Sequence, residues 1–168
     1  IYPSDIGCYT LGINLGAVDT VLCMGAAVSQ AAGFDYAHRL SGKQVDIVAT
    51  IGDSTFYHCG SAAISQAIKL GQDITFLILD NATTAMTGHQ TTPGLEWDVL
   101  GHPTAVQDIE EILRGMAATN DMTIVRVDPE KRDEYIEQAG ILGGGGGGED
   151  DVRVGWDGDG SLGHDRRG

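Results

Sequence analysis

Two polar clusters follow two apolar runs of the chain. Gly52-Asp53-Ser54 comes directly after the run from Val45 to Ile51, and Asp80-Asn81 comes directly after the run from Ile74 to Leu79. Carboxylate, amide and main-chain carbonyl oxygens are ligands that Mg²⁺ accepts, with phosphate oxygens and water in its remaining positions. The residue types therefore predict a site for a hard divalent cation that carries a diphosphate.

The two apolar runs decide whether these clusters can meet. If the runs are parallel strands joined by a helix, a right-handed crossover puts both carboxyl ends at one edge of a sheet, where open α/β sheets bind ligands. The helix expected after Asp53 would turn backbone N–H groups toward the same anion. We therefore expect Asp53 and Asn81 to face one cavity.

The wording of these segments is similar to that of a known family. Gly52-Asp53-Ser54, separated by 26 residues from Asn81, resembles the thiamine-diphosphate motif. GDSTFYH, LDNATTAMTGHQ and the upstream SDIGCYTLG resemble the thiamine-diphosphate domain of the indolepyruvate ferredoxin oxidoreductases, within the broader family of 2-oxoacid:ferredoxin oxidoreductases. The resemblance extends from about Ser4 to Tyr135, and it implies thiamine diphosphate and Mg²⁺ as cofactors.

The order of the expected elements favours the fold of that family. We expect strands at 19–24, 45–51, 74–79 and 122–127, and helices at 26–40, 56–70, 105–118 and 130–139. Thr104 is the expected N-cap of the third helix, and residues 1–17 are expected to form a loop that approaches a ligand closely. The βαβ rhythm predicts a doubly wound, mostly parallel α/β sheet with helices on both faces.

The resemblance also implies which residues touch the cofactor. It assigns these contacts to Gly7, Cys8, Met24, Gly25, Gly52, Asp53, Ser54, Asn81 and Thr83. Asp53, Asn81 and the main-chain carbonyl of Thr83 would hold the metal, and Met24 would support the bent form of the cofactor. By residue type alone, Cys8 and Met24 would more often be part of the core.

Two histidines are candidate catalytic residues, and each has two interpretations. His58 is either a capping histidine near a helix start or a group that points at the substrate carboxylate. His89 lies beside Gly88 in a polar loop too long for a tight turn, and long ordered loops are usually functional. It is therefore either a group that reaches the reacting centre or a solvent-exposed loop residue.

The resemblance implies oxidative decarboxylation of a 2-oxoacid, with an aryl pyruvate such as indolepyruvate as the substrate. The acyl group would go to coenzyme A, and electrons would pass through iron–sulfur clusters to ferredoxin. A pyrimidine-binding domain or partner subunit would supply the activating glutamate, so we expect an oligomer that is incomplete without it. Two alternatives are a non-oxidative decarboxylase of the sulfopyruvate or phosphonopyruvate type and a non-catalytic nucleotide-binding domain.

Composition disfavours several classes of partner. The 168 residues suffice for one sizeable core, and the formal charge of −14 disfavours nucleic acid and anionic membranes as partners. Cys8, Cys23 and Cys59 form no CxxC pair, so we expect iron–sulfur clusters on other segments or a partner subunit. No apolar run approaches the roughly 20 residues of a membrane span. We therefore expect an internal piece of a soluble, cytoplasmic protein.

The composition changes sharply at Gly140. The last 29 residues hold 12 glycines and few apolar residues, and such a segment buries too little surface to offset its ordering entropy. We expect a partial thiamine-diphosphate and Mg²⁺-binding domain at 1–139 and a disordered tail without a further strand at 140–168. The tail resembles an out-of-frame reading of a GC-rich gene more than a domain.

Overall fold

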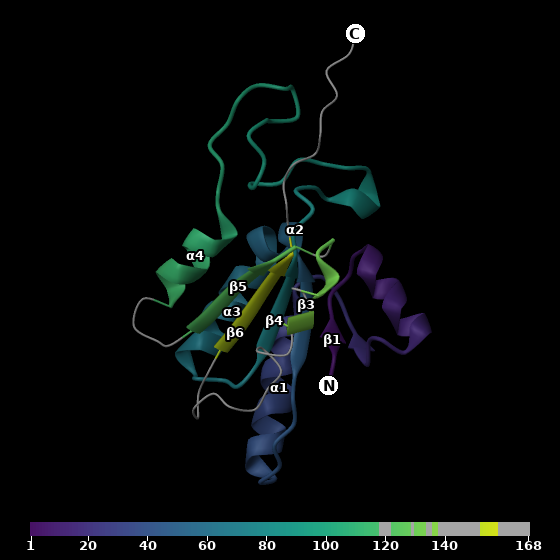
Figure 1. Cartoon of the computed structure of the whole chain (residues 1–168), viewed down its shortest axis with the longest axis vertical. Coiled ribbons are helices and arrows are strands. Elements are labelled where there is room, and N and C mark those ends of the chain that lie inside the picture. The colour runs from purple at the N-terminus through teal and green to yellow at the C-terminus, as the bar shows by residue number, and fades with distance from the viewer. Residues whose placement is uncertain (118–121, 129, 134–135, 138–151, 158–168) are drawn as a thin grey trace.

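Six parallel strands form one sheet in the order β2-β1-β3-β4-β6-β5 (Figure 1). The computed structural model describes residues 1–117, 122–128, 130–133, 136–137 and 152–157. The strands are β1 (Pro3–Ser4), β2 (Thr20–Val21), β3 (Val48–Gly52), β4 (Thr75–Leu79), β5 (Met122–Val127) and β6 (Val152–Asp157). The prediction of a parallel α/β sheet is therefore confirmed.

The connections reverse direction beside β1. The chain leaves β1 for β2 on one side, and β3 pairs with β1 on the other side. In an open parallel sheet, such a switch point leaves a crevice at the carboxyl ends of the two strands. The fold therefore directs a ligand site to the loops that follow β1, β3 and their neighbour β4.

Helices pack on one face of the sheet over a single core. They are α1 (Ala26–Leu40), α2 (Asp53–Thr55), the π-helical η2 (Phe56–Gly60), α3 (Ser61–Lys69) and α4 (Ile109–Met116). The core joins Ala27 and Ala31 of α1 to Ile64 of α3, Leu113 of α4 and inward residues of β3 and β4 such as Phe76. Burying a large apolar side chain stabilises a fold by about 1.5–3 kcal/mol.

The other face of the sheet carries the segment after β5. Helical residues at 132–133 and 136–137 lie in front of the strands, on the opposite side from α1 and α3 (Figure 1). The helix expected at 130–139 falls partly outside the described residues. No helix in the described part of the chain is long and apolar enough to cross a membrane.

The third expected helix begins later than its sequence suggests. α4 starts at Ile109 because Asp108 is the N-cap, and its Oδ1 accepts a hydrogen bond from the Glu111 N–H at 2.9 Å. Thr104 instead donates its hydroxyl to the Leu95 carbonyl at 3.3 Å. The prediction of a helix from 105 with Thr104 as its cap is therefore wrong.

The expected loop at the amino end is partly regular. β1 and the 3₁₀ helix η1 (Cys8–Leu15) occupy it, while the strand expected at 19–24 shortens to Thr20–Val21. The prediction that the tail adds no strand is also wrong, since Val152–Asp157 pairs with both β4 and β5. The rest of the tail lies outside the described residues, and the domain division at 139 stays a prediction.

Candidate functional site

A cavity of about 340 Å³ lies at the carboxyl ends of β1, β3 and β4, and we name it the carboxyl-end cavity. Its volume is within the range of small-molecule sites. Its lining comprises Ile6, Gly7, Cys8, Tyr9, Met24, Gly52, Asp53, Ser54, Thr55, Leu79, Asn81, Thr83, Thr84, Ala85, Met86 and Thr87. The expectation that Asp53 and Asn81 face one cavity is confirmed.

Most of the residues predicted to touch a cofactor meet in this cavity. They are Gly7, Cys8, Met24, Gly52, Asp53, Ser54, Asn81 and Thr83. Gly25 is the exception, because its N–H donates a hydrogen bond to Asp5 Oδ2 at 2.7 Å instead of lining the cavity. Met24 is 49% exposed, so it is not part of the core.

Asp53 is a buried carboxylate that the fold does not neutralise. It follows β3 directly, is 2% exposed, and its Oδ2 has no hydrogen-bond partner among the described residues. Burial, together with the neighbouring carboxylate of Asp80, raises the pKa of Asp53 to about 7 against an opposing hydrogen bond from the Ser54 N–H. The site therefore favours a proton or a cation at Asp53.

Two short turns present Asn81 and Thr83 to the cavity. Asp80 Oδ1 accepts a hydrogen bond from the Ala82 N–H at 3.0 Å, and Asn81 Oδ1 accepts one from the Thr83 N–H at 3.2 Å. These turns hold Ala82 in the left-handed region, with φ of 54°. A non-glycine residue in that conformation is strained, and such strain clusters at functional sites.

Hydroxyl groups tie the loop after β4 to the start of the helix after β3. Ser54 Oγ and Thr84 Oγ1 are 2.7 Å apart. The loop closes on itself through the Thr84 N–H and the Thr83 hydroxyl, which both donate to the Gln90 carbonyl, at 3.0 and 3.1 Å. The loop is therefore an ordered wall of the cavity.

The available donors suit a hard cation. Asp53 supplies an unpartnered carboxylate oxygen, Asn81 an amide oxygen, and Thr83 a main-chain carbonyl. Within the described ranges, no three His, Cys, Asp or Glu side chains gather as a metal site. The predicted set contains one carboxylate only, so the residues present fit Mg²⁺ bound together with phosphate oxygens.

Two residues at this site escaped the sequence analysis. Asp5 follows β1, is fully buried, and receives hydrogen bonds from the N–H groups of Ile6 and Gly25. Burial raises the pKa of Asp5. Tyr9 lines the cavity itself, and its hydroxyl is buried. A two-residue strand has no periodicity that could have revealed either residue.

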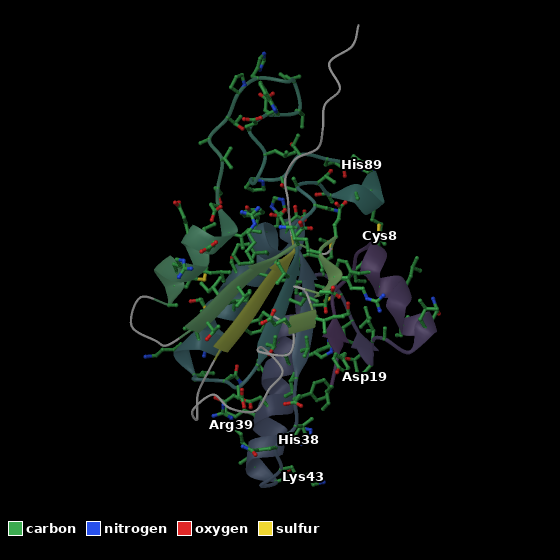
Figure 2. All side chains as sticks on the ribbon, viewed as in Figure 1. Cys8, Asp19, His38, Arg39, Lys43 and His89 are labelled. Carbon is green, nitrogen blue, oxygen red and sulfur yellow. The ribbon has the colours of Figure 1, made fainter. Side chains whose placement is uncertain are left out.

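The two candidate catalytic histidines lie outside the cavity lining. His58 is exposed in η2, and His89 is exposed at φ of 59° in the loop after β4. In Figure 2, His89 lies on the same side of the molecule as Cys8, whose exposed thiol does line the cavity. The catalytic roles of His58 and His89 stay predictions.

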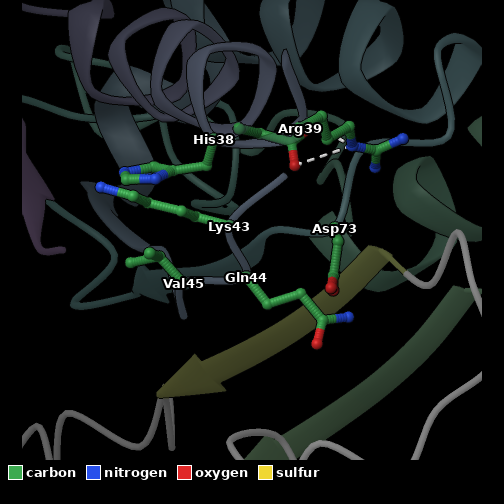
Figure 3. A pocket seen from close by; sticks show the side chains of 7 residues that line it. His38, Arg39, Lys43, Gln44, Val45 and Asp73 are labelled. Atoms are coloured by element: carbon green, nitrogen blue, oxygen red, sulfur yellow. Dashed lines mark hydrogen bonds and ion pairs between the residues drawn. The ribbon is translucent and has the colours of Figure 1, made fainter. Parts of the chain in front are cut away.

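A second hollow of about 310 Å³, which we name the amino-end hollow, lies at the opposite end of the sheet (Figure 3). Asp35, His38 and Arg39 line it from the last turns of α1, and residues 43–45 and Asp73 line it from the segments before β3 and β4. Arg39 Nε lies 2.9 Å from both carboxylate oxygens of Asp35, and its Nη2 donates to the Gly71 carbonyl at 2.7 Å. This hollow contains none of the predicted site residues.

Comparison with solved structures identifies the fold. The chain superposes with a TM-score of 0.76 on 2-oxoglutarate:ferredoxin oxidoreductase from Magnetococcus marinus, at 16% identity over 93% of this chain and 53% of that chain. The TM-score is 0.56 with benzoylformate decarboxylase from Polynucleobacter necessarius, at 14% identity over 94% of this chain and 29% of that chain. At these identities the similarity shows a shared fold.

Curated relatives are more similar in sequence. The chain is 50% identical over 115 residues to indolepyruvate oxidoreductase subunit IorA of Archaeoglobus fulgidus, which covers 67% of this chain and 18% of the relative. It is 40% identical over 141 residues to the subunit of that name from Methanothermobacter marburgensis, covering 83% of this chain and 22% of the relative. The chain thus spans about a fifth of the length of these relatives.

Residues 5–145 match the family model described as thiamine pyrophosphate enzyme, C-terminal TPP binding domain. The matched range includes β3, β4 and every residue that lines the carboxyl-end cavity, and it begins directly after β1. The chain belongs to the thiamine pyrophosphate enzyme family, as its C-terminal TPP-binding domain.

Proposed function

We propose that this chain is the Mg²⁺- and thiamine-diphosphate-binding part of a 2-oxoacid:ferredoxin oxidoreductase. The observation that carries the proposal is the buried Asp53 carboxylate, which has an unpartnered oxygen and a second carboxylate, Asp80, beside it. A bound divalent cation would supply the charge that this site lacks. Asp53, the Asn81 side chain and the Thr83 carbonyl would hold the metal.

Other lining residues would hold and enclose the cofactor. Gly52 and Ser54 lie next to Asp53 and would contact the diphosphate, while Gly7, Cys8 and Met24 would contact the rest of the molecule. Thiamine diphosphate, when bound, supplies the electron sink that decarboxylation of a 2-oxoacid requires. Apolar side chains such as Leu79 and Met86 would exclude water from the site.

The two histidines would act on the substrate only after a further element approaches. Both are exposed and outside the cavity lining. The carboxylate of a bound 2-oxoacid would therefore have to extend out of the cavity to reach them, or a docked domain would have to enclose it beside them. We keep His58 and His89 as candidates because each precedes or follows a segment that lines the cavity. Gly25 would act indirectly, through the turn that carries Met24.

The substrate and partners are proposed from the relatives. Their name favours an aryl pyruvate, indolepyruvate, as the 2-oxoacid. Coenzyme A, ferredoxin, iron–sulfur clusters and a pyrimidine-binding domain or subunit would complete the reaction outside this chain. We propose an oligomer, since the relatives are named as subunits, and we propose that it lies in the cytoplasm.

A non-oxidative decarboxylase is the alternative with structural support. Benzoylformate decarboxylase shares the fold with a TM-score of 0.56, so the fold does not separate the two reactions. Identities of 40–50% with relatives named as oxidoreductases favour the oxidative reaction. Indolepyruvate-dependent reduction of ferredoxin by the full-length protein, with coenzyme A present, distinguishes the reactions.

Isothermal titration calorimetry of the chain with thiamine diphosphate tests the cofactor assignment. Affinity should depend on Mg²⁺. Asp53→Ala should weaken it by at least the roughly 10- to 100-fold that the loss of an outer-shell partner of a metal costs, because here a ligand itself is lost. The exposed Asp73, in the amino-end hollow, provides the control, and Asp73→Ala should bind normally. A non-catalytic nucleotide-binding domain would have no Mg²⁺-dependent affinity for this cofactor, and equal affinity of Asp53→Ala and wild type would contradict the metal assignment.

A further inference from the structure

Tyr9 is a polar side chain of the carboxyl-end cavity that the motifs leave without a role. Its ring lies against two glycines of the predicted site. A Cβ on Gly7 would lie 2.8 Å from Tyr9 Cζ and would collide with Cε1, whereas a Cβ on Gly52 would lie 3.4 Å from the hydroxyl oxygen. The hydroxyl therefore lies beside Gly52, one residue before Asp53.

Hydrogen bonds of Thr10 hold the backbone around Tyr9. The Gly7 N–H donates to Thr10 Oγ1 at 2.8 Å, and the Thr10 hydroxyl donates to the Asp5 carbonyl at 2.9 Å. Thr10 thus joins the end of β1 to the first turn of η1, which carries Tyr9. A preorganised side chain contributes more to binding because less freedom is lost.

The Tyr9 hydroxyl has no well-formed hydrogen bond in the described part of the chain, although it lies beside the Gly52 backbone and the Thr55 side chain. Asp53 Oδ2 is the other buried oxygen of this cavity without a partner. Leaving a buried polar group unsatisfied lowers the stability of a fold. Two such groups from different elements in one cavity indicate a polar ligand between them.

The groups that line the cavity determine which kind of ligand it can bind. Burial and the nearby carboxylates of Asp5 and Asp53 raise the pKa of Tyr9 to about 12, so the hydroxyl stays protonated at neutral pH. Among the described residues, no lysine or arginine lines the cavity. An anionic ligand therefore depends on a metal ion, backbone N–H groups and neutral hydroxyl donors.

We infer that the Tyr9 hydroxyl donates a hydrogen bond to a diphosphate oxygen of the bound cofactor. Among the motif residues, Ser54 is the only other one to which we assign a side-chain donor for the diphosphate. The inference rests on the proposed function. It makes Tyr9 a binding residue of the diphosphate subsite, where it complements the metal held by Asp53.

Calorimetry of Tyr9→Phe tests this inference, with Mg²⁺ and either thiamine diphosphate or inorganic pyrophosphate as the probe. Loss of one hydrogen bond to a charged oxygen should weaken both probes by about 10- to 100-fold. The unfolding midpoint of the ligand-free variant should change little, since the hydroxyl has only weak interactions with the Gly52 backbone and the Thr55 side chain to lose. A midpoint lowered by several degrees would assign the hydroxyl a structural role and overturn the inference.

Tyr57→Phe is the matched control. The Tyr57 hydroxyl donates to the Gln107 carbonyl at 2.7 Å and lies outside the carboxyl-end cavity, so its loss should lower the unfolding midpoint and leave both affinities unchanged.

Wild-type affinity of Tyr9→Phe, with binding lost in Asp53→Ala, would overturn the inference and leave the proposed function standing. Weaker binding of thiamine diphosphate but not of pyrophosphate would overturn the diphosphate assignment. Absence of binding by the wild-type chain would overturn both proposals.

Discussion

Two buried aspartates at opposite ends of the sheet differ in their charged neighbours. Asp35 is 5% exposed in the amino-end hollow, and the guanidinium of Arg39 lies 2.9 Å from both of its oxygens. Asp53 is 2% exposed in the carboxyl-end cavity, has Asp80 as its neighbour, and forms no ion pair among the described residues. The chain neutralises the first carboxylate itself, whereas we propose that a cation from outside neutralises the second.

The two ends of the sheet also differ in which residue types adopt the left-handed backbone conformation. At the amino end, glycines occupy the left-handed positions of the turns before β3 and β4, with φ of 67° at Gly42 and 55° at Gly71. After β4, Ala82 and His89 adopt this conformation, and they are the only non-glycine residues to do so in the described ranges. Strain and unsatisfied charge therefore occur together at the end that we assign to the cofactor.

The largest expected effect is the pH dependence of stability that Asp53 contributes. Its pKa is raised from 3.8 to about 7, so the folded chain keeps a proton that the unfolded chain loses as the pH rises past 4. The stability contributed by this group is full below pH 4 and is lost between pH 4 and pH 7, by about 4 kcal/mol in total. Urea unfolding of the metal-free chain across this range measures the loss.

Asp53→Asn isolates this contribution from the other titrating groups. The difference in free energy of unfolding between the variant and wild type should grow in favour of the variant from pH 4 to pH 7. Parallel stability curves for the two proteins would mean that the fold already neutralises Asp53, and the contrast with Asp35 would disappear.

The same substitution at Asp35 should act with the opposite sign. Asp35→Asn removes the ion pair with Arg39, whose side chain is 41% exposed, so the loss of stability should be about 1 kcal/mol. Thermal unfolding near pH 8 measures both variants, and calorimetry should find unchanged Mg²⁺-dependent affinity in Asp35→Asn. If Asp35→Asn and Asp53→Asn changed stability in the same direction, the proposed difference between a paired and an unpaired carboxylate would be wrong.

The smallest effect concerns the left-handed residues. Ala82→Gly should relieve strain and raise the stability of the ligand-free chain by about 0.5–1 kcal/mol, while Gly71→Ala should lower it by about 1 kcal/mol. Urea unfolding of the two single variants measures both values. Ala82 would not be a strained position if its replacement by glycine lowered stability.

The sequence predicts the centre of the fold because two long apolar runs end in polar clusters. Those runs became β3 and β4, paired in parallel from Val48 with Thr75 to Gly52 with Leu79. Their register alone brings Asp53 and Asn81 to one edge of the sheet. Residues 45–81 alone therefore predicted that Asp53 and Asn81 would lie close together.

Tertiary contacts decide what the sequence could not predict. β1 has two residues and no periodicity, and it becomes a strand only between β2 and β3. The segment SDIGCYTLG therefore showed a resemblance but did not indicate where Asp5 and Tyr9 would lie. Asp108 replaced Thr104 as the cap because residues 95 and 96 bind Thr104 in the preceding loop. β6 was missed because its glycine-rich surroundings masked the alternating residues of VRVGWD.

The π-helical turn η2 gives the chain one place where its length can change. It joins α2 to α3 without interrupting the helix, and a π turn holds one residue more than an α turn. In a regular α-helix an added residue would rotate everything beyond it by about 100°. Here the extra residue is absorbed locally, so Asp53 faces the cavity while Ile64 and Ile68 remain on the core. We therefore expect that deletion of one residue at 57–59 would restore an α turn and leave the position of α3 on the sheet unchanged.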